Sequence, residues 1–267
     1  EGQYVTSRQI KERLERELEV NVGLEVEFNG DTFEVSGRGE MHLAILMENM
    51  RREGYEIEVS EPEVIFKEIN GERCEPFEEV ELEVPSKYSG TVIDKLSNRA
   101  GNMVHMETEG SQNIIQFEIP TRGLFGYRSE FVKDTHGEGI LSRSFLEFRP
   151  DVGEIHQDNT GSMVSMAKGK ALAYSLDDLQ DRGQLFIEPG TEVYKGMVIG
   201  NTADGQYLEV NPTTGKDLDN MRAAGSDEKI DLAPAVEIDL QKGMEIMKQD
   251  EFLEVTPEDV RLRKQDF

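Results

Sequence analysis

The chain has a single cysteine, no long apolar run and few basic residues, and each shortage excludes a class of protein. Cys74 has no partner for an internal disulfide or a cysteine-based zinc site, which fits a reducing, cytoplasmic compartment. No window of about 18 apolar residues occurs, so no membrane-spanning helix is predicted. The N-terminal residues lack the basic start and the apolar segment of a signal peptide, and we do not expect one there.

Lysine and arginine are outnumbered, because 29 of them stand against 55 aspartates and glutamates, for a net charge of −26. Nucleic acid repels such a chain at long range, so the composition alone argues against an RNA partner. Local basic or polar patches can still bind RNA within a large assembly, and acidic surfaces are also common in salt-tolerant organisms. An acidic scaffold that binds other proteins is therefore an alternative function.

Motifs for nucleotide hydrolysis and for catalysis are also missing. No Gly-x-x-x-x-Gly-Lys-Ser/Thr segment occurs, so no phosphate-binding P-loop is predicted. The histidines lack a second histidine or an acid at a metalloprotease spacing, and no serine lies in a nucleophile elbow. We therefore predict no catalytic residue, no metal site and no bound cofactor in this chain. An enzyme that hydrolyses GTP or another substrate is the competing class of function.

One glycine pair lies where a dinucleotide-binding fingerprint would place it. Gly37 and Gly39 follow a predicted strand and open a predicted helix. His42, however, occupies the position of the third glycine, and no ribose-binding acid follows. We interpret the segment as a tight strand-to-helix turn that needs the backbone freedom of glycine. A side chain there would be costly if φ is positive.

Two successive segments share one pattern. Residues 1–69 and 76–149 can each be read as a β-α-β-β-α-β unit, except that the first copy lacks its opening strand. Residues 6–9 form a capping box, and apolar residues follow at helical spacing, so the first helix starts almost at Glu1. Because a split βαβ sandwich needs a strand before that helix, we expect the chain to be a piece of a longer protein.

The predicted fold class is α+β, with two ferredoxin-like sandwiches, the first truncated at its N-terminus, followed by a β-rich C-terminal domain. In the two sandwiches we expect strands at residues 20–28, 32–36, 55–59, 64–66, 80–84, 103–108, 113–119 and 140–148. Besides the first helix, which the capping box at 6–9 begins, we expect helices at about 40–52, 86–98 and 124–133. After about residue 153 we expect strands at 162–165, 171–174, 185–188, 197–200, 206–210, 252–255 and 260–264, and helices at 175–181 and 239–249.

A long polar loop is the leading candidate for contact with RNA. Residues 211–229 contain only Leu218 and Met221 as large apolar side chains, and a loop of that length is usually functional or disordered. Basic and amide side chains in such a loop suit phosphates and sugars, although a solvated loop explains the composition equally well. The candidate RNA-binding residues of the loop are Lys216, Asn220, Arg222 and Lys229.

Three arginines outside the loop complete the candidate set. Arg99 lies at the exit of a predicted helix. Arg261 and Arg263 alternate, together with Lys264, along a predicted strand near the C-terminal end of the sequence. A solvated edge strand is the alternative explanation for these last residues.

Short segments of the sequence resemble two domains of the translational GTPases. Residues 36–43, Ser-Gly-Arg-Gly-Glu-Met-His-Leu, and residues 48–54 resemble the third domain, where elongation factor G carries a similar Gly-x-Gly-Glu-Leu-His-Leu segment. Another set of residues resembles the fifth domain: 75–76, 85, 88–90, 99–103 and 122–128. Elongation factor G has its fourth domain between these two, whereas Cys74 to Glu79 joins them directly in this chain.

The remaining sequence distinguishes between members of the family. LepA also lacks the fourth domain but has a different C-terminal domain. Residues 181–199, 214–216 and 220–223 look like the C-terminal domain of the BipA, or TypA, family, and the resemblance covers nearly the whole chain. We place the domains at residues 1–73 (like the third domain of elongation factor G), 74–151 (like its fifth domain) and 152–267 (the BipA-type C-terminal domain).

The resemblance implies a GTPase that binds the bacterial ribosome and acts in stress adaptation and large-subunit assembly. Its GTP and Mg²⁺ site would lie in a domain that this chain does not contain. The resemblance also implies contacts with 23S rRNA in the factor-binding region and with A-site tRNA near the C-terminal loop. We expect a monomer. The alternatives are an acidic protein-interaction scaffold or a fragment of another translational GTPase such as LepA.

Overall fold

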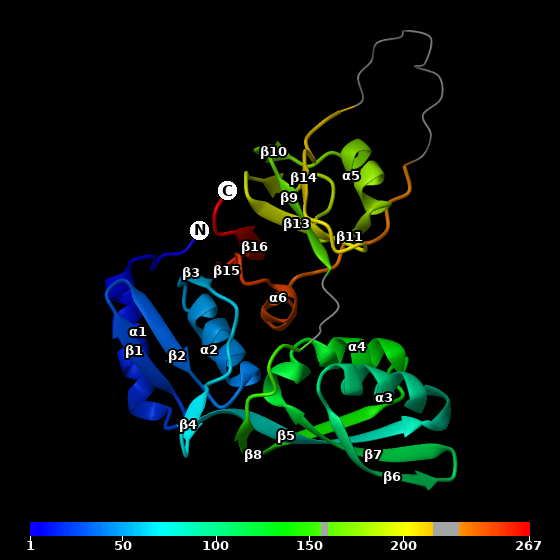
Figure 1. The fold of residues 1–267 in the computed structure, drawn as a ribbon. Coiled ribbons are helices and arrows are strands. Elements are labelled where there is room, and N and C mark those ends of the chain that lie inside the picture. The colour runs from blue at the N-terminus through cyan, green and yellow to red at the C-terminus, as the bar shows by residue number, and fades with distance from the viewer. Residues whose placement is uncertain (156–159, 216–229) are drawn as a thin grey trace. The chain divides into compact units, whose positions relative to one another are not determined.

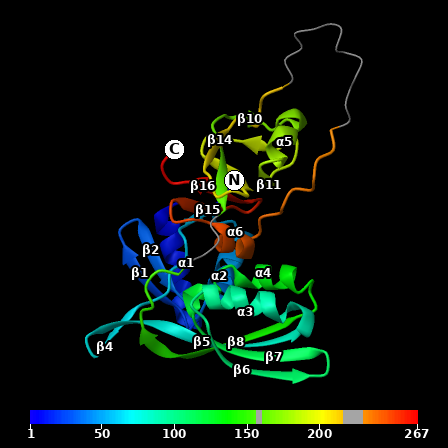
Figure 2. The same ribbon diagram turned by 45° about the vertical axis from the view of Figure 1, so that its right-hand side comes forward.

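The computed structural model describes residues 1–155, 160–215 and 230–267. They form two compact units, one made of Glu1–Pro62 with Asn159–Phe267 and the other of Glu63–Asp158 (Figures 1 and 2). We call them unit 1 and unit 2. Unit 2 is thus inserted between two stretches of sequence that fold together. Among the residues described, no helix is long and apolar enough to cross a membrane.

Unit 2 is a complete ferredoxin-like sandwich, as predicted. Its five-stranded sheet has the order β4-β5-β7-β6, with β8 also beside β5 and every pair antiparallel. α3 and α4 cover one face (Figure 1). Val80, Leu82 and Val84 alternate along β5 and are fully buried against these helices. The elements are β4 (Lys67–Ile69), β5 (Glu72–Pro85), α3 (Ser89–Asn98), β6 (Asn102–Glu109), β7 (Gln112–Pro120), α4 (Tyr127–Asp134) and β8 (Ile140–Pro150), with 3-10 turns η1 (Ser86–Tyr88) and η2 (Thr121–Leu124) before α3 and α4.

Unit 1 begins with the predicted helix and hairpin. Thr6 caps α1 (Ser7–Val20) through the predicted capping box with Gln9, and β1 (Glu25–Asn29) pairs with β2 (Thr32–Ser36). The predicted strand start at Val20 is wrong, because α1 continues to that residue and the chain turns before β1. The predicted strand at 64–66 is also wrong, since β4 begins only at Lys67. α2 (Glu40–Arg52) has the predicted bounds.

The two sandwiches differ in the first strand of the pattern, which is present in the sheet of unit 2 and missing from the described residues of unit 1. In unit 2 the first strand, β5, lies in the sheet between the last strand, β8, and the third, β7. In unit 1 the residues before α1 make a single bridge, between Tyr4 and Tyr55, so β2 has no neighbour that would link it to β3 (Ile57–Val59). β3 pairs instead with β15 (Glu251–Val255), almost 200 residues further along the chain.

The C-terminal stretch is rich in short strands, as predicted, and is built on the sheet that β3 joins. The order of this sheet is β14-β9-β13-β16-β15-β3, with β11 beside β13. The remaining elements are β9 (Gly161–Ser165), β10 (Gly169–Lys170), α5 (Ala173–Gln180), β11 (Gly183–Leu185), β12 (Glu192–Val193), β13 (Met197–Thr202), β14 (Leu208–Val210), α6 (Leu240–Ile246) and β16 (Val260–Lys264). Its core includes Met47 of α2 together with Met244 and Leu253, so both stretches of unit 1 share one core.

The predicted strand at 171–174 is wrong. The chain is extended only to Leu172, and α5 begins at Ala173. Leu172, Leu176 and Leu179 have helical spacing, and the last two are buried in the C-terminal core, which favours a helix over a strand. The same alternation of apolar and small residues fits both periods over four residues, which is why the sequence pattern misleads there.

The two glycines before α2 lie outside the left-handed region of φ. Gly39 is the residue before the helix and has φ 160°, which is extended backbone. Gly37 is likewise outside the left-handed region. The reason for glycine at position 37 is close packing, because a Cβ atom there would lie 2.9 Å from Nδ1 of His42. No atom lies within 4 Å of a Cβ placed at Gly39.

Candidate RNA-binding residues

The long polar loop is described only at its two flanks, because Lys216, Asn220, Arg222 and Lys229 lie outside the described residues. Both flanks are bound to α5. The hydroxyl of Ser175, in the first turn of the helix, donates to the carbonyl of Thr214. At the other end of the helix, Gln180 donates to the carbonyl of Asp231 at 3.1 Å and accepts from the amide of Ala233 at 2.9 Å. α5 therefore determines where the loop leaves the domain and where it returns.

An apolar pocket lies beneath the returning flank. Its volume is about 130 Å³, and it is lined mainly by apolar residues of α5, of the segment after β11 and of residues 232–235. Glu188 is the single charged residue in the lining. The pocket suits an apolar group and has no donor for a phosphate, so it adds nothing to the candidate RNA site.

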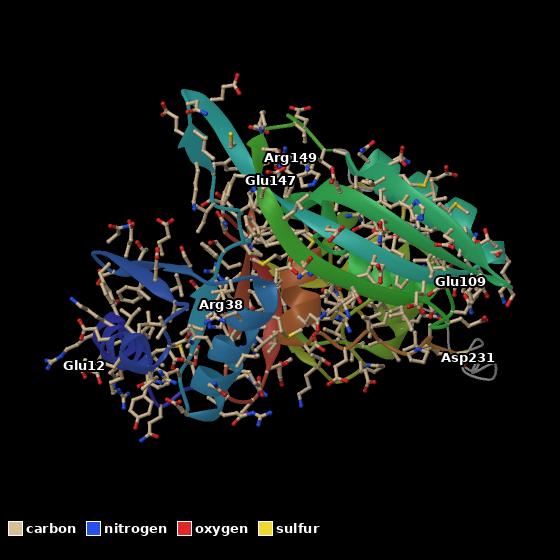
Figure 3. The ribbon with its side chains drawn as sticks, turned by 90° about the horizontal axis from the view of Figure 1, so that it is seen from below. Glu12, Arg38, Glu109, Glu147, Arg149 and Asp231 are labelled. Atoms are coloured by element: carbon tan, nitrogen blue, oxygen red, sulfur yellow. The ribbon has the colours of Figure 1, made fainter. Side chains whose placement is uncertain are left out.

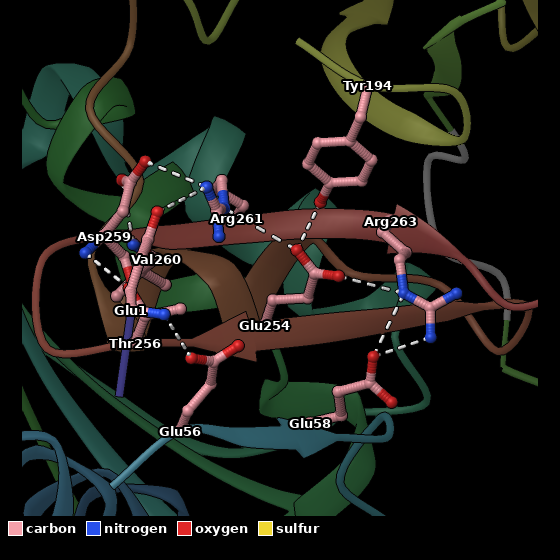
Figure 4. A network of polar contacts seen from close by, with 10 residues as sticks. All are labelled: Glu1, Glu56, Glu58, Tyr194, Glu254, Thr256, Asp259, Val260, Arg261 and Arg263. Carbon is pink, nitrogen blue, oxygen red and sulfur yellow. Dashed lines mark hydrogen bonds and ion pairs between the residues drawn. The ribbon is translucent and has the colours of Figure 1, made fainter. Parts of the chain in front are cut away.

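Arg261 and Arg263 lie on β16 within a network of carboxylates (Figure 4). The guanidinium of Arg263 donates to Oε1 of Glu58 on β3 at 2.7 Å and lies 3.0 Å from Oε1 of Glu254 on β15. Arg261 lies 3.6 Å from the second oxygen of Glu254 and 3.5 Å from the carboxylate of Glu1. Arg263 therefore ties β3 to β15 and β16, and Arg261 ties Glu1 to the same two C-terminal strands.

These contacts and burial raise the pKa of two groups in the network. The hydrogen bond from Arg263 to Glu58 raises the pKa of the guanidinium. Burial, followed by the hydrogen bond that its hydroxyl donates to Glu254, raises the pKa of Tyr194. Arg263 therefore stays charged at neutral pH, and each arginine faces at least one carboxylate. Their RNA-binding role stays a prediction.

Lys264 does not share the face of Arg263, contrary to the predicted alternation. It is 6% exposed and points to the opposite side of β16, where its amine lies 3.0 Å from Glu251. Nor is β16 an edge strand, because it pairs with β13 and β15. The alternative of a solvated edge is therefore wrong.

The cluster around Lys264 also contains a serine between a lysine and a carboxylate. Lys248 donates to the hydroxyl of Ser162 at 2.7 Å, and that hydroxyl donates to Glu251 at 2.6 Å. Burial lowers the pKa of Lys248. A Ser–Lys pair can form a nucleophile in hydrolases, but Ser162 is 3% exposed and no substrate can reach it. The cluster therefore joins β9, β15 and β16 and is no catalytic site.

Arg99 lies in unit 2, where most of the hydrogen-bonding capacity of its guanidinium is used. Its side chain is 7% exposed, and the guanidinium donates to the carbonyls of Gly123 and Phe125 at 3.0 and 2.8 Å and to Glu130 at 2.6 Å. These bonds tie the end of α3 to η2 and α4. The described geometry leaves little of this guanidinium for a phosphate.

The open face of the unit 2 sheet is acidic. Because Val80, Leu82 and Val84 point to the helices, Glu79, Glu81 and Glu83 point away from them. Figure 3 looks onto this sheet from the side opposite the helices, with Glu109 near one end and Glu147 and Arg149 near the other. Arg149 is engaged by Glu118 and Glu147 at 2.6 and 2.8 Å. RNA phosphates are therefore repelled from this face.

Of the candidates that lie within the described residues, Arg261 and Arg263 come together in one network, and Arg99 lies in unit 2. Comparison with known proteins then identifies the chain. Residues 160–267 match the family model of the TypA/BipA C-terminal domain, and residues 72–159 match that of the elongation factor G C-terminus. Across 99% of its length the chain is 47% identical to the large ribosomal subunit assembly factor BipA of Synechocystis sp. and 46% identical to that of Bacillus subtilis.

This chain belongs to the BipA family. The protein of the same name from Escherichia coli K12 is also 47% identical over 99% of the chain. The chain spans 45% of the length of the Synechocystis relative and 44% of the E. coli one. The BipA C-terminal model contains the long loop and both arginines of β16, whereas Arg99 falls within the elongation factor G model. A fragment of LepA is excluded by the match to the BipA C-terminal domain.

Proposed function

We propose that this chain is the ribosome-binding part of a large-subunit assembly factor and that it acts by binding RNA. One observation carries the proposal: the chain is 47% identical, over 99% of its length, to proteins named large ribosomal subunit assembly factor BipA. Among the described residues, no group of three or more His, Cys, Asp or Glu could hold a metal ion.

The contacts that we propose are with 23S rRNA in the factor-binding region and with A-site tRNA. The long loop is the element that supports them best, because α5 anchors both of its flanks and three of its residues are basic. Such side chains reach phosphates and 2′-hydroxyls while the acidic body of the chain stays clear of the RNA. Arg99, Arg261 and Arg263 act mainly by holding their own units together.

Catalysis belongs to another part of the protein in this proposal. The chain spans less than half of its relatives and contains no P-loop, so any GTP and Mg²⁺ bind outside it. The whole protein acts in the cytoplasm as a monomer on the ribosome, in stress adaptation and subunit assembly. This chain contributes binding and no hydrolysis.

Co-sedimentation with ribosomes tests the proposal. The chain is pelleted with 50S subunits and with 70S ribosomes over a salt series, beside the double variant Lys216→Ala/Arg222→Ala. Two lost phosphate contacts should weaken binding and reduce the slope of log K against log salt by roughly 1.5–2. Lys11→Ala, in the exposed Lys11–Glu15 pair of α1, is the control and should sediment like the wild type.

Two outcomes contradict the proposal at different levels. If the double variant sediments like the wild type at every salt concentration, the loop is only a solvated connection. If the wild-type chain itself fails to sediment with ribosomes at low salt, ribosome binding is wrong, and the acidic face of unit 2 favours a scaffold for basic proteins instead. Unchanged thermal unfolding of each variant ensures that the comparison concerns binding.

A further inference from the structure

We propose that a second surface of the C-terminal domain binds unpaired RNA, with two lysines on the phosphates and a tyrosine stacked on a base. The surface consists of Met166, Lys168, Lys170, Leu172 and Tyr174, and we call it the 166–174 strip. It lies outside the long loop. The inference rests on the proposed function in its choice of RNA as the partner.

Exposure alternates along the strip. Met166, Leu172 and Tyr174 are 51%, 40% and 41% exposed, and both lysines are exposed as well. The residues between them are less exposed: Ala167, Gly169 and Ala173 are half-buried, and Ala171 is 1% exposed. Side chains two residues apart in extended backbone lie on one side, separated by roughly 7 Å. Lys168, Lys170 and Leu172 therefore present a row of side chains to solvent, and Tyr174 is exposed in the first turn of α5, two residues beyond Leu172.

The backbone of the strip is held in place by neighbouring segments. The amide of Met166 donates to Val210 at 2.9 Å, that of Ala171 to Thr191 at 2.9 Å and that of Leu172 to Pro212 at 2.9 Å. A surface that is fixed before binding loses less conformational entropy when a ligand binds. The last of these bonds also places the strip next to the entry flank of the long loop.

The local charge around the strip favours RNA as its partner. No aspartate or glutamate occurs from residue 160 to residue 176, although the whole chain has 55 among 267 residues, or about one in five. Lys168 makes no ion pair or hydrogen bond within the part of the chain that the structure describes. Lys170 lies 3.6 Å from Glu192, but both side chains are about 70% exposed, so water weakens this pair.

A third lysine lies at the same end of the domain. Lys195 is exposed, with its amine 5.2 Å from the ring of Phe267, and the next residue, Gly196, donates its amide to Ser165 at 2.8 Å. Lysines free to meet phosphates, beside an exposed tyrosine that offers a stacking face, are the features of a single-strand-binding surface. A protein that bound the apolar side chains of the strip would need neither the lysines nor the absence of acidic residues.

Fluorescence anisotropy tests the inference. The chain is titrated into a labelled single-stranded decaribonucleotide of mixed sequence at low salt, and into the same strand annealed to its complement. Lys168→Gln/Lys170→Gln should weaken single-strand binding about 10-fold and reduce the salt slope by roughly 1.4, the value for two phosphate contacts on a single strand. Lys11→Gln/Lys242→Gln removes the same charge elsewhere in unit 1 and should leave binding unchanged.

The tyrosine is tested separately from the charges. Tyr174→Leu should weaken binding about 10-fold with an unchanged salt slope, because the loss is one of stacking. Tyr174→Phe keeps the ring and should bind like the wild type. Circular dichroism melts of each variant separate loss of binding from loss of folding.

Three results would overturn the inference. They are an absence of single-strand binding by the wild-type chain, equal binding of the duplex, and wild-type affinity in both the lysine and the leucine variants. Ribosome sedimentation, measured in parallel, separates this inference from the proposed function. A chain that binds the oligonucleotide through the strip but does not sediment refutes the proposed function alone. A chain that sediments while the strip variants bind the oligonucleotide normally refutes the strip alone.

Discussion

Arginine side chains in this acidic chain are held by carboxylates of their own unit. Arg13 donates to Glu53 at 2.6 and 2.8 Å, and Arg122 donates to the fully buried Glu75 at 2.5 and 2.9 Å. Arg263 and Arg99 follow the same pattern. With almost two acids for every base, a guanidinium readily meets a carboxylate of the same fold. Basic residues of such a chain are therefore poor indicators of RNA binding unless their surroundings lack acids.

Arg99 provides the residue-scale prediction. Arg99→Ala should lower the free energy of unfolding of unit 2 by about 3 kcal/mol or more, because Glu130 and the carbonyl of Gly123 lose their donor in a largely buried site. Urea denaturation followed by circular dichroism measures the change. Arg128→Ala, on the exposed side of α4, is the control and should stay within about 0.5 kcal/mol of the wild type.

A different result would reassign Arg99. If Arg99→Ala keeps the urea midpoint of the wild type but loses ribosome binding, its guanidinium contacts RNA directly, and the interpretation as a link between α3, η2 and α4 is wrong.

Helices whose ends carry strong sequence signals begin or end where the sequence predicts. The capping box at Thr6 and the left-handed Gly54 define the start of α1 and the end of α2, because each supplies a local hydrogen bond or backbone conformation. Predictions failed where tertiary burial decided the outcome. The start of α5 depends on placing Leu176 and Leu179 in a core formed by distant strands.

The candidate site was less predictable than the fold. Whether Arg261 is free or paired depends on Glu1 and Glu254, and the first of these is 260 residues away in sequence. No local pattern contains that information. The acid-free stretch that includes Lys168 and Lys170, in contrast, is visible in the sequence as a local gap in charge. A search for missing acids, rather than for basic residues, would have found it.

The turn before α2 provides the element-scale prediction. Gly37→Ala should destabilise unit 1 by about 1–2 kcal/mol, because the new methyl group crowds the ring of His42. That ring accepts a hydrogen bond from the amide of Arg38 at 3.2 Å and contacts Asn21 at the end of α1. Gly39→Ser should be neutral or stabilising by up to about 1 kcal/mol, since it adds a capping hydroxyl to extended backbone with open space around it.

Urea midpoints of the two variants decide the matter. Equal midpoints for Gly37→Ala and the wild type would mean that His42 moves aside without cost, and that packing does not explain glycine at position 37.

At the scale of the whole molecule, the two folding units do not simply follow one another along the sequence. Unit 2 occupies a continuous stretch, Glu63–Asp158, whereas unit 1 needs the residues on both sides of it. α2 packs against α6, and β3 pairs with β15, so residues 1–62 cannot complete their core alone.

Excised segments test this division. Residues 63–158 should fold alone and unfold cooperatively, because their sheet and both covering helices are complete. Residues 1–62 alone should lack a dispersed NMR spectrum, and should gain one when mixed with residues 159–267. A native-like spectrum for the isolated 1–62 peptide would refute the dependence of β3 on β15.

The pairing of β3 with β15 also has a consequence during synthesis. Val59 leaves the ribosome roughly 190 residues ahead of its partner, Leu253. At about 5–20 residues per second, this strand waits roughly 10–40 s for its neighbour. Throughout that time its edge is open to wrong partners. Unit 2 is completed within the same interval, so the nascent chain passes through a state in which its middle is folded and its beginning is not. Slower translation of residues 63–250 would lengthen the exposure of this edge without changing any contact of the finished protein.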